Sequence, residues 1–214
     1  MTSDYTRQLD LLDPSKVKTP LTIIGAGSVG SFTALSLAKM GIQDITVYDG
    51  DTVEEHNIPN QFYRMEDIGR PKVAALLDIV YEFTGVEIKP VNELYKDQEL
   101  KGIVISAVDS MKARKLIWRR LKGIPGVDLY IDARMGAEVG KLYSICPIQD
   151  VKLYQQSLHA AKEALHEPCT RRTIVYTVLG ISAYICGHVK KFLAGESIKK
   201  ELTIDFKLGM IIPQ

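Results

Sequence analysis

The sequence is poor in cysteine, and its few cysteines are widely spaced. Cys146, Cys169 and Cys186 are the only ones among 214 residues, and no two of them lie within three positions of each other. This spacing excludes the paired Cys-x-x-Cys ligands of a zinc site or a redox pair, so we expect no structural zinc. A small and odd number of cysteines favours a reducing compartment without structural disulfides.

The sequence also lacks a strong excess of charge of either sign. Its formal net charge is +1 at pH 7. This balance gives no reason to expect a basic face, so nucleic acid is a poor candidate partner. Lysine and arginine do cluster in KARKLIWRR and GHVKKF, but such clusters are typical of the solvated faces of helices.

No hydrophobic run is long enough to suggest a membrane segment. The longest apolar region, at about 173–193, is interrupted by Tyr184, His188, Lys190 and Lys191, which predicts a buried helix rather than a membrane span. The polar N-terminus, MTSDYTRQLD, lacks the apolar core of a signal peptide. We therefore expect a cytoplasmic protein that does not bind a membrane.

The composition is nevertheless sufficient for a sizeable hydrophobic core. Hydrophobic residues make up 46% of the chain and charged residues 25%, as in globular proteins. The length suits one α/β domain over 1–214. Within it we expect an N-terminal helical arm over 1–17, a nucleotide-binding half over 18–125 and a half for substrate and dimer contacts over 126–214.

Strands and helices alternate through the first half of the chain. The apolar runs and helical spacings predict strands at 21–25, 45–48, 86–91 and 102–108, separated by helices at 28–40, 71–83 and 110–122. This alternation predicts a Rossmann-like, mostly parallel sheet with helices on both faces. Pro90 favours an edge position for the third strand. We expect antiparallel strands to be added to the sheet by the later segments, which comprise strands at 128–135 and 138–145, helices at 151–166 and 173–194, and a final hairpin.

Gly25, Gly27 and Gly30 form a G-x-G-x-x-G pattern between the first strand and the first helix. In this context the pattern predicts a nucleotide site. The first glycine permits a tight turn, the second lets backbone approach a phosphate, and the third lets helix and strand pack closely. Ser28 opens the helix, whose free N–H groups attract a phosphate. The pattern alone does not choose between NAD, FAD and ATP.

Acidic and polar residues follow the second strand. Asp49 ends this strand, where a carboxylate can accept hydrogen bonds from both ribose hydroxyls of a nucleotide. Its alternative role is to cap a helix or to stabilise a turn. Asp51 is a second candidate for nucleotide binding. A dehydrogenase has no clear use for the polar residues behind them, whereas a reaction at an α-phosphate uses such groups to stabilise charge on phosphoryl oxygens. These residues are Asn57, Asn60, Gln61, Arg64, Arg70 and Lys72.

Lys72 and Asp109 are the candidates for binding a triphosphate and its metal. Lys72 follows a proline at a helix start, which would fix its position; a solvated surface lysine is the alternative. Asp109 ends the fourth strand at the carboxyl edge of the sheet, where ligands bind in open α/β folds. A carboxylate there suits magnesium, and it could also cap the helix that begins at Ser110.

These motifs, in this order, resemble the ThiF/MoeB/ubiquitin-activating superfamily. The resemblance covers most of the chain and rests on YTRQLDLL, GAGSVG, DGDTVEEHNIPNQ, DIGRPK, SAVDSMKAR and the helix YTVLGISAYICGHVKKFLAG. It implies ATP- and Mg²⁺-dependent adenylylation of the C-terminal glycine of a small ubiquitin-like or sulfur-carrier protein. It also implies a homodimer or a pseudo-symmetric heterodimer.

The resemblance assigns roles to individual residues. It implies that Asn57 lies near the phosphates, that Lys72 binds them and that Asp109 binds Mg²⁺. Arg7 is similar to a family arginine that extends across the dimer interface and contacts the triphosphate bound by the other subunit. The alternative is that Arg7 is an ordinary surface residue. Cys169, followed by threonine, resembles the catalytic cysteine of ubiquitin-activating members, which accepts the acyl group as a thioester; a structural or incidental cysteine is the alternative.

One position departs from the family pattern. Asn60-Gln61 stands where the family usually has Arg-Gln. That arginine contacts phosphate, and Arg64 or Arg70 is the candidate replacement. If Arg64 takes its place, Arg64→Ala lowers activity by more than about tenfold.

Two other functions remain open from the sequence. The Asn60 departure favours a catalytically silent dimer scaffold or partner-binding module. An NAD-dependent oxidoreductase would account for the glycines and Asp49, but it would leave 57–72 and Asp109 without roles.

Overall fold

The computed structural model describes residues 4–158 and 173–213, and its centre is an eight-stranded sheet. The strands lie in the order β3-β2-β1-β4-β5-β6-β7-β8. They are β1 (Leu21–Ile24), β2 (Ile45–Tyr48), β3 (Lys89–Val91), β4 (Gly102–Ser106), β5 (Val127–Gly136), β6 (Val139–Ile145), β7 (Glu201–Asp205) and β8 (Met210–Pro213).

The sheet is parallel in its first half and antiparallel in its second half. Strands β3, β2, β1, β4 and β5 pair in parallel, and β6, β7 and β8 add antiparallel to β5. Every residue of β4 is buried, as expected for a parallel strand that is covered on both faces. Strand β3, which contains Pro90, lies at the edge. The predicted fold class is therefore confirmed.

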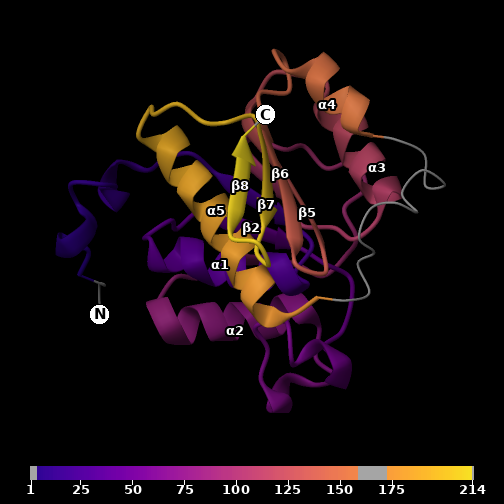
Figure 1. The fold of residues 1–214 in the computed structure, drawn as a ribbon. Coiled ribbons are helices and arrows are strands. Elements are labelled where there is room, and N and C mark those ends of the chain that lie inside the picture. The colour runs from indigo at the N-terminus through magenta and orange to yellow at the C-terminus, as the bar shows by residue number, and fades with distance from the viewer. Residues whose placement is uncertain (1–3, 159–172, 214) are drawn as a thin grey trace.

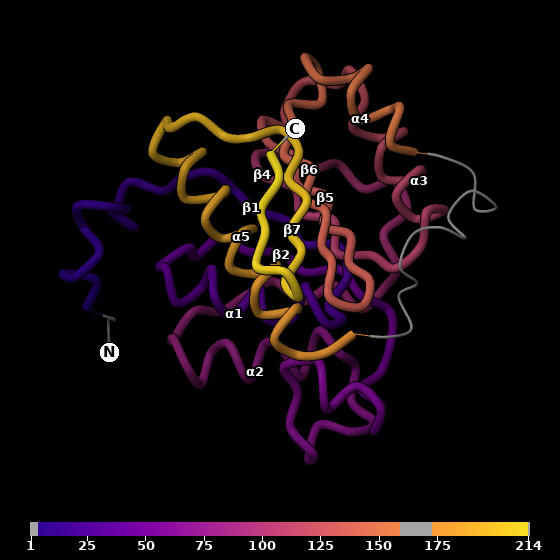
Figure 2. Tube along the Cα trace, viewed as in Figure 1, coloured from indigo at the N-terminus to yellow at the C-terminus, as the bar shows by residue number. Residues whose placement is uncertain are grey.

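Helices cover both faces of this sheet (Figures 1 and 2). One apolar cluster joins α1, α2 and α5 to one face, and a second joins α3 and α4 to the other. Helix α1 packs against both α2 and α5. The helices are α1 (Ser28–Lys39), α2 (Lys72–Thr84), α3 (Met111–Leu121), α4 (Val151–Ser157) and α5 (Val175–Leu193).

Local signals in the sequence account for several helix ends. Helix α2 ends at Thr84 and is followed by Gly85, whose φ of 72° is the left-handed conformation that glycine adopts at little cost. Helix α3 begins after Ser110, whose side chain accepts a hydrogen bond from the Ala113 amide at 3.2 Å. Helices α2 and α3 therefore begin and end close to their predicted boundaries.

The N-terminal arm differs from the expected helix. It contains two short 3-10 turns, Thr6–Gln8 and Pro14–Lys16. An isolated short helix is unstable unless one face packs on the protein. Here Leu12 is buried while Leu9 and Leu11 are exposed, so the arm lacks an apolar face for a regular helix. Of the helix expected over 151–166, the structure describes α4 (Val151–Ser157), and residues 159–172 lie outside the described residues.

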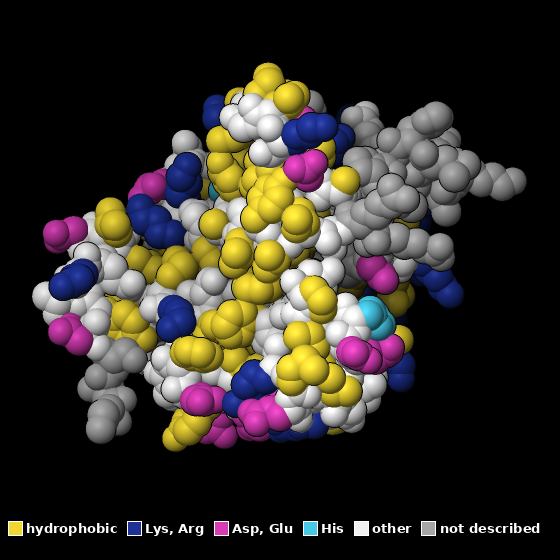
Figure 3. All heavy atoms as spheres, turned by 60° about the horizontal axis from the view of Figure 1, so that its bottom comes forward, with side chains coloured by type: hydrophobic (Ala, Val, Ile, Leu, Met, Phe, Trp, Pro, Cys, Tyr) yellow, Lys and Arg dark blue, Asp and Glu magenta, His cyan; other side chains and the backbone are white. Residues whose placement is uncertain are grey.

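Exposed apolar side chains gather around the start of α5 and on β8. Figure 3 shows apolar side chains collected in the middle of one face of the molecule. The large exposed apolar residues just before α5, in its first turns and on β8 are Ile174, Val175, Tyr176, Leu179, Met210, Ile211 and Ile212. Within the described part of the chain, no helix combines the length and apolar character needed to cross a bilayer.

Candidate nucleotide-binding site

The carboxyl ends of β2, β1 and β4 lie side by side and form the base of the candidate site. Ile24 pairs with Tyr48 on one side and with Ser106 on the other. The residues that follow these strands therefore meet at one edge of the sheet. The order of the strands reverses at this point, because β2 and β3 lie on one side of β1 and β4 and β5 lie on the other. Ligands bind at such a switch point in folds of this kind.

The three glycines of the loop after β1 have different surroundings. Gly25 has a φ of 100°, and a Cβ there would lie 2.7 Å from the Ala107 carbonyl oxygen. A Cβ on Gly30 would lie 1.8 Å from the Gly25 carbonyl oxygen. A Cβ on Gly27 would meet no atom within 4 Å. Packing thus requires Gly25 and Gly30, whereas Gly27, just before α1, leaves space for a ligand.

Hydrogen bonds fix the peptide groups on both sides of Ala26. Its amide donates to the Asp49 carboxylate at 2.7 Å, and its carbonyl accepts from the Tyr63 hydroxyl at 2.6 Å. Asp49 also accepts from the Asp51 amide at 2.8 Å. Burial raises the pKa of the Asp49 carboxyl above its usual value, although these amides and the charge of Lys72 oppose the rise. Asp49 therefore ties the end of β2 to the glycine loop.

Lys72, the first residue of α2, is a buried cation in this structure. Only 7% of the residue is exposed, and its Nζ lies 3.0 Å from a carboxylate oxygen of Asp51. Its backbone amide donates to the Asp51 carbonyl at 2.9 Å. The backbone of Val53 pairs with that of Gly69 and Arg70, which brings the start of α2 beside the segment that follows β2.

The polar segment behind β2 is held by its own side chains. Asn57 is buried, and its Oδ1 accepts from the Glu54 amide at 2.9 Å. Asn60, at the position of the family arginine, donates from Nδ2 to the Thr173 hydroxyl at 3.0 Å. The Oε1 of Gln61 is buried without a hydrogen-bond partner in the described structure. Asn60 thus joins this segment to the residues just before α5.

Arg64 and Arg70 both pair with the wholly buried carboxylate of Asp67. The Nε of Arg64 lies 3.1 Å from this carboxylate, and Nη1 of Arg70 lies 2.9 Å from it. Arg64 also pairs with Glu66 and Glu82, each at 3.0 Å. Burial would raise the pKa of Asp67, but the two arginines hold it below its usual value. To contact a phosphate, Arg64 would have to break its ion pairs with three carboxylates.

Asp109 is exposed at the carboxyl edge, between β4 and α3. The alternative role of capping α3 is filled by Ser110, which leaves the Asp109 carboxylate available to a ligand. Across residues 4–158 and 173–213, no three His, Cys, Asp or Glu side chains converge to hold a metal ion by themselves.

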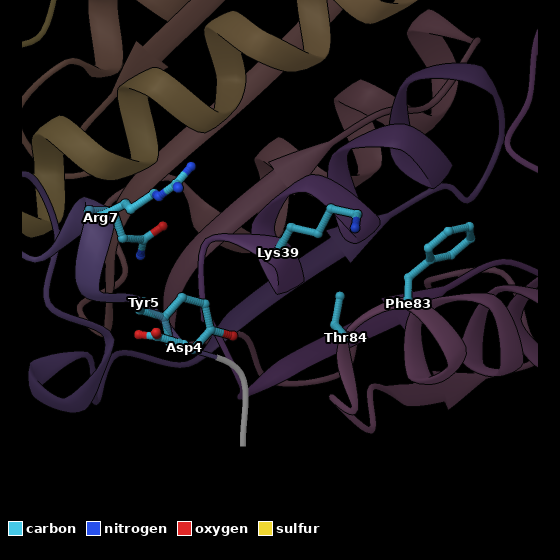
Figure 4. A pocket seen from close by; sticks show the side chains of 7 residues that line it. Asp4, Tyr5, Arg7, Lys39, Phe83 and Thr84 are labelled. Carbon is cyan, nitrogen blue, oxygen red and sulfur yellow. The ribbon is translucent and has the colours of Figure 1, made fainter. Parts of the chain in front are cut away.

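Arg7 lies at the opposite end of α1 from the glycine loop. Its neighbour Gln8 donates to the carbonyl of Met40 at 2.8 Å, just after α1 ends. Arg7 lines a cavity of about 260 Å³ together with Lys39 and Phe83 (Figure 4). The 12 residues of α1 span about 18 Å at 1.5 Å per residue. The structure therefore separates Arg7 from the other predicted site residues of the same chain.

The cysteines differ in their surroundings. Cys186 is buried in α5, and burial raises the pKa of its thiol to about 12, so it is unreactive. Cys146 is partly exposed. Cys169, the candidate for thioester formation, lies outside the described residues.

Several residues that shape the site have no obvious signal in the sequence. In the sequence Tyr63 is one aromatic residue in a polar segment, and its hydrogen bond with the Ala26 carbonyl depends on the tertiary structure. Asp67 lies inside the motif DIGRPK, but its role in pairing two arginines requires the folded loop.

Comparison with known proteins identifies the family. The ThiF family model matches residues 15–207, so the chain belongs to the ThiF family. The catalytic subunit of the NEDD8-activating enzyme E1 from Arabidopsis thaliana is 33% identical over 129 residues, which cover 52% of this chain and 28% of that protein. The adenylyltransferase and sulfurtransferase MOCS3-1 from Zea mays is 32% identical over 109 residues, which cover 47% of this chain and 23% of that protein. The matches thus span about a quarter of the length of these relatives.

Solved structures share the fold at low sequence identity. MccB from E. coli, solved with ATP, superposes with a TM-score of 0.73 at 16% identity and covers 94% of this chain and 64% of its own. PaaA gives a TM-score of 0.73 at 18% identity and covers 94% and 65%. These similarities establish a common fold over nearly the whole of this chain.

Proposed function

We propose that this protein adenylylates the C-terminal glycine carboxylate of a small ubiquitin-like or sulfur-carrier protein, with ATP as co-substrate and Mg²⁺ as its metal. The observation that carries the proposal is the arrangement at one sheet edge of the open Gly27, the buried cation of Lys72 and the exposed carboxylate of Asp109. Membership of the ThiF family supports it.

The glycine loop and Lys72 are suited to the phosphates of ATP. The start of α1 has free N–H groups and a partial positive charge, and Gly27 leaves room in front of them. Lys72 pairs with an exposed carboxylate, Asp51, and a phosphate could replace or share this partner. The same fold has been solved with ATP in MccB, which supports ATP rather than NAD as the ligand.

Asp109 is suited to hold Mg²⁺ together with the phosphates. Magnesium is usually bound through one or two carboxylates plus substrate phosphates and water. A single exposed carboxylate is therefore enough, and Asp51 offers a second. When bound, the ion would neutralise charge on the phosphate oxygens.

The chain's own residues would contribute mainly by positioning and charge. An oxygen of the substrate carboxylate attacks the α-phosphorus and forms a new P–O bond. The bond to the oxygen between the α and β phosphorus breaks, and pyrophosphate leaves with its electron pair. Lys72 stabilises the charge that develops, and the loop amides hold the phosphates in place. No general base is needed, because a terminal carboxylate is already ionised at neutral pH.

The protein substrate is inferred from the relatives. The names of the two plant relatives refer to activation of NEDD8 and to adenylyl and sulfur transfer. Because each match covers only about a quarter of the relative, the partner remains part of the proposal. Transfer of the acyl group to Cys169 is a further step of the same proposal: the thiolate attacks the acyl carbon, and AMP leaves.

We also propose that the active form is a dimer in which Arg7 serves the partner's site. About 18 Å of α1 separates Arg7 from its own glycine loop, so its own triphosphate is out of reach. The exposed apolar side chains at the start of α5 and on β8 offer a surface for a second copy.

One observation favours a second candidate function, a catalytically silent scaffold or partner-binding module. Asn60 replaces the family arginine and bonds Thr173, while Arg64 and Arg70 are occupied by carboxylates. A site without that arginine would stabilise the transferred phosphoryl group less well.

Isotope exchange between pyrophosphate and ATP separates these functions. The assay combines the protein, Mg²⁺, ATP and labelled pyrophosphate with a candidate ubiquitin-like protein that ends in Gly-Gly. The proposal expects exchange that requires the intact glycine terminus and is lost in Lys72→Ala. Tight ATP binding without exchange would favour the scaffold, and tight NAD binding without ATP binding would favour an oxidoreductase.

A further inference from the structure

A buried cluster of charged side chains lies directly beneath the carboxyl edge of the sheet. Its centre is Asp132 on β5, which is wholly buried and level with Ser106 of β4. Arg114 of α3 and Arg134 of β5 both pair with this carboxylate, through Nε at 3.0 Å and 2.8 Å. One carboxylate thus faces two buried guanidinium groups, and none of the three belongs to the site assigned above.

The cluster is charged in the folded protein. Burial alone would raise the pKa of Asp132, but the two arginines and a hydrogen bond from Tyr154 hold it below its usual value. Apolar side chains of similar volume often stabilise a core as well as buried ion pairs do. The contacts that the arginines make beyond Asp132 therefore matter for interpreting the cluster.

The second contact of Arg114 is with the backbone next to Asp109. Its Nη2 donates to the Val108 carbonyl oxygen at 2.6 Å. That carbonyl shares a planar peptide group with the nitrogen and Cα of Asp109. A donor that fixes the carbonyl therefore also fixes the point from which the Asp109 side chain starts. On the other side of Asp109, Ser110 is fixed by capping α3.

Arg134 uses the same carboxylate but holds a different element. Its Nη1 and Nη2 donate to the carbonyl and hydroxyl oxygens of Ser157 at 3.0 Å and 2.8 Å, at the end of α4. Its guanidinium also lies 4.6 Å from the centre of the Tyr143 ring. No contact joins it to Val108 in the described structure, which makes it a matched control for Arg114.

We propose that Arg114, oriented by Asp132, is a positioning residue that places Asp109 for the metal of a bound nucleotide. The inference rests on the proposed function, because it assumes that Mg²⁺ and ATP bind at this edge. It adds that the buried cluster, and not only the exposed carboxylate, determines how well the edge holds the metal.

Arg114→Lys and Arg134→Lys form the matched pair of variants. Each keeps a positive charge beside Asp132, but one ammonium group cannot reproduce the separate contacts of a guanidinium. We expect Arg114→Lys to raise the Mg²⁺ concentration needed for half-maximal ATP binding about tenfold, the usual scale for losing an outer partner of a metal ligand. Calorimetric titration of ATP at a series of Mg²⁺ concentrations measures this, and Arg134→Lys should leave the requirement unchanged.

A second readout needs no ligand. The amides of Ala107 and Ala113 lie on either side of Asp109 and donate to the Ile24 carbonyl and the Ser110 hydroxyl. In the protein without added nucleotide, their hydrogen exchange should become faster in Arg114→Lys and stay unchanged in Arg134→Lys. In Asp109→Asn, adding Arg114→Lys should cause no further loss of Mg²⁺-dependent binding, because the two residues act in one chain of contacts. Arg114→Gln replaces Arg114→Lys if the latter does not fold.

The outcomes separate this inference from the proposed function. If the wild-type protein binds no ATP in the presence of Mg²⁺, the proposed function is contradicted. The amide hydrogen exchange experiment still tests the placement of Asp109 in that case. Equal effects of the two lysine variants on the Mg²⁺ requirement, or unaltered amide hydrogen exchange at Ala107 and Ala113, would mean that the cluster only stabilises the fold.

Discussion

The hydroxyl of Tyr63 donates a 2.6 Å hydrogen bond to the carbonyl of Ala26, in the middle of the glycine loop. The amide of the same residue is held by Asp49. Both peptide groups around Ala26 are thus fixed by side chains from other segments. These two hydrogen bonds come from the protein's own side chains and hold the loop in one arrangement, so the cost of ordering the loop on binding is small.

The first prediction concerns this hydrogen bond. Tyr63→Phe removes only the hydroxyl and keeps the buried ring. Losing such a bond costs about 1 kcal/mol, so we expect ATP binding to weaken about fivefold as the loop becomes less ordered. Titration calorimetry at saturating Mg²⁺ measures the change.

Tyr81→Phe is the control for this substitution, because Tyr81 is exposed on α2 and distant in sequence from the loop. It should leave ATP affinity unchanged. Equal ATP affinity in Tyr63→Phe and the wild type would show that the Tyr63 hydroxyl has no part in shaping the nucleotide site.

The second prediction contrasts two glycines of the same loop. In Gly30→Ala the new Cβ would lie 1.8 Å from the Gly25 carbonyl oxygen, and the resulting overpacking should lower the free energy of unfolding by about 3 kcal/mol. Gly27→Ala meets no atom within 4 Å, so stability should change by less than about 0.5 kcal/mol. Its methyl group would instead occupy the space in front of α1, and ATP should bind about tenfold more weakly.

Urea unfolding and ATP titration of the two variants test this contrast. Each variant serves as the control for the other. A destabilised Gly27→Ala protein would mean that the loop is packed more tightly than the structure indicates. Unchanged ATP binding by a folded Gly27→Ala protein would place the phosphates elsewhere.

The fold could be predicted closely from the sequence because its signals are local. Buried apolar strands such as 102–106 alternate with helices whose ends carry Ser110 or Gly85, and each signal depends on neighbouring residues only. The N-terminal arm was mispredicted as helical because its apolar residues Leu9 and Leu11 find no partner surface in the described structure, which helical spacing cannot reveal.

The candidate site could be predicted only in part. Its glycines and Asp49 are placed by strand ends, so their position at the sheet edge follows from the topology. The contacts of Arg64 and Arg70 with Asp67 depend on how the loop folds onto α2. Residue type alone therefore suggests two free arginines where the structure has two ion-paired ones.

The third prediction is a loss of stability in acid caused by His188. Burial, together with the nearby charge of Lys191, lowers the pKa of His188 from 6.5 to about 4. Its Nδ1 lies 2.7 Å from the buried Ser144 hydroxyl. Between these two pKa values the unfolded chain binds a proton that the folded protein does not. Stability contributed by neutral His188 is therefore complete above the unfolded pKa and is lost as the pH falls toward the folded pKa.

Urea unfolding at a series of pH values measures this effect. From about pH 7 to about pH 5, His188 should account for about 2 kcal/mol of lost stability. His188→Gln removes the titration and can still bond Ser144, so its stability should fall less over this range. His56→Gln, which alters an exposed histidine, should follow the wild type. Parallel pH profiles of His188→Gln and the wild type would contradict the prediction.

The fourth prediction tests whether Arg7 acts across a dimer. Arg7→Ala and Lys72→Ala should each lack pyrophosphate exchange when assayed alone. In a mixed dimer, the Arg7→Ala subunit supplies an intact Lys72, and the Lys72→Ala subunit supplies Arg7 to the same site. Random exchange of subunits makes half of the dimers mixed, with one complete site of two, so about a quarter of wild-type activity should return.

This recovery distinguishes the two placements of Arg7. If Arg7 acted on its own subunit's triphosphate, one subunit of the mixed dimer would lack Arg7 at its site and the other would lack Lys72. Neither site would be complete, and mixing would restore no activity. The separation of Arg7 from its own glycine loop by the length of α1 favours recovery. Sedimentation of the two variants alone and mixed should establish that both still dimerise, so that absent activity cannot be attributed to lost assembly. Full activity of Arg7→Ala by itself would instead make Arg7 an ordinary surface residue of the N-terminal arm.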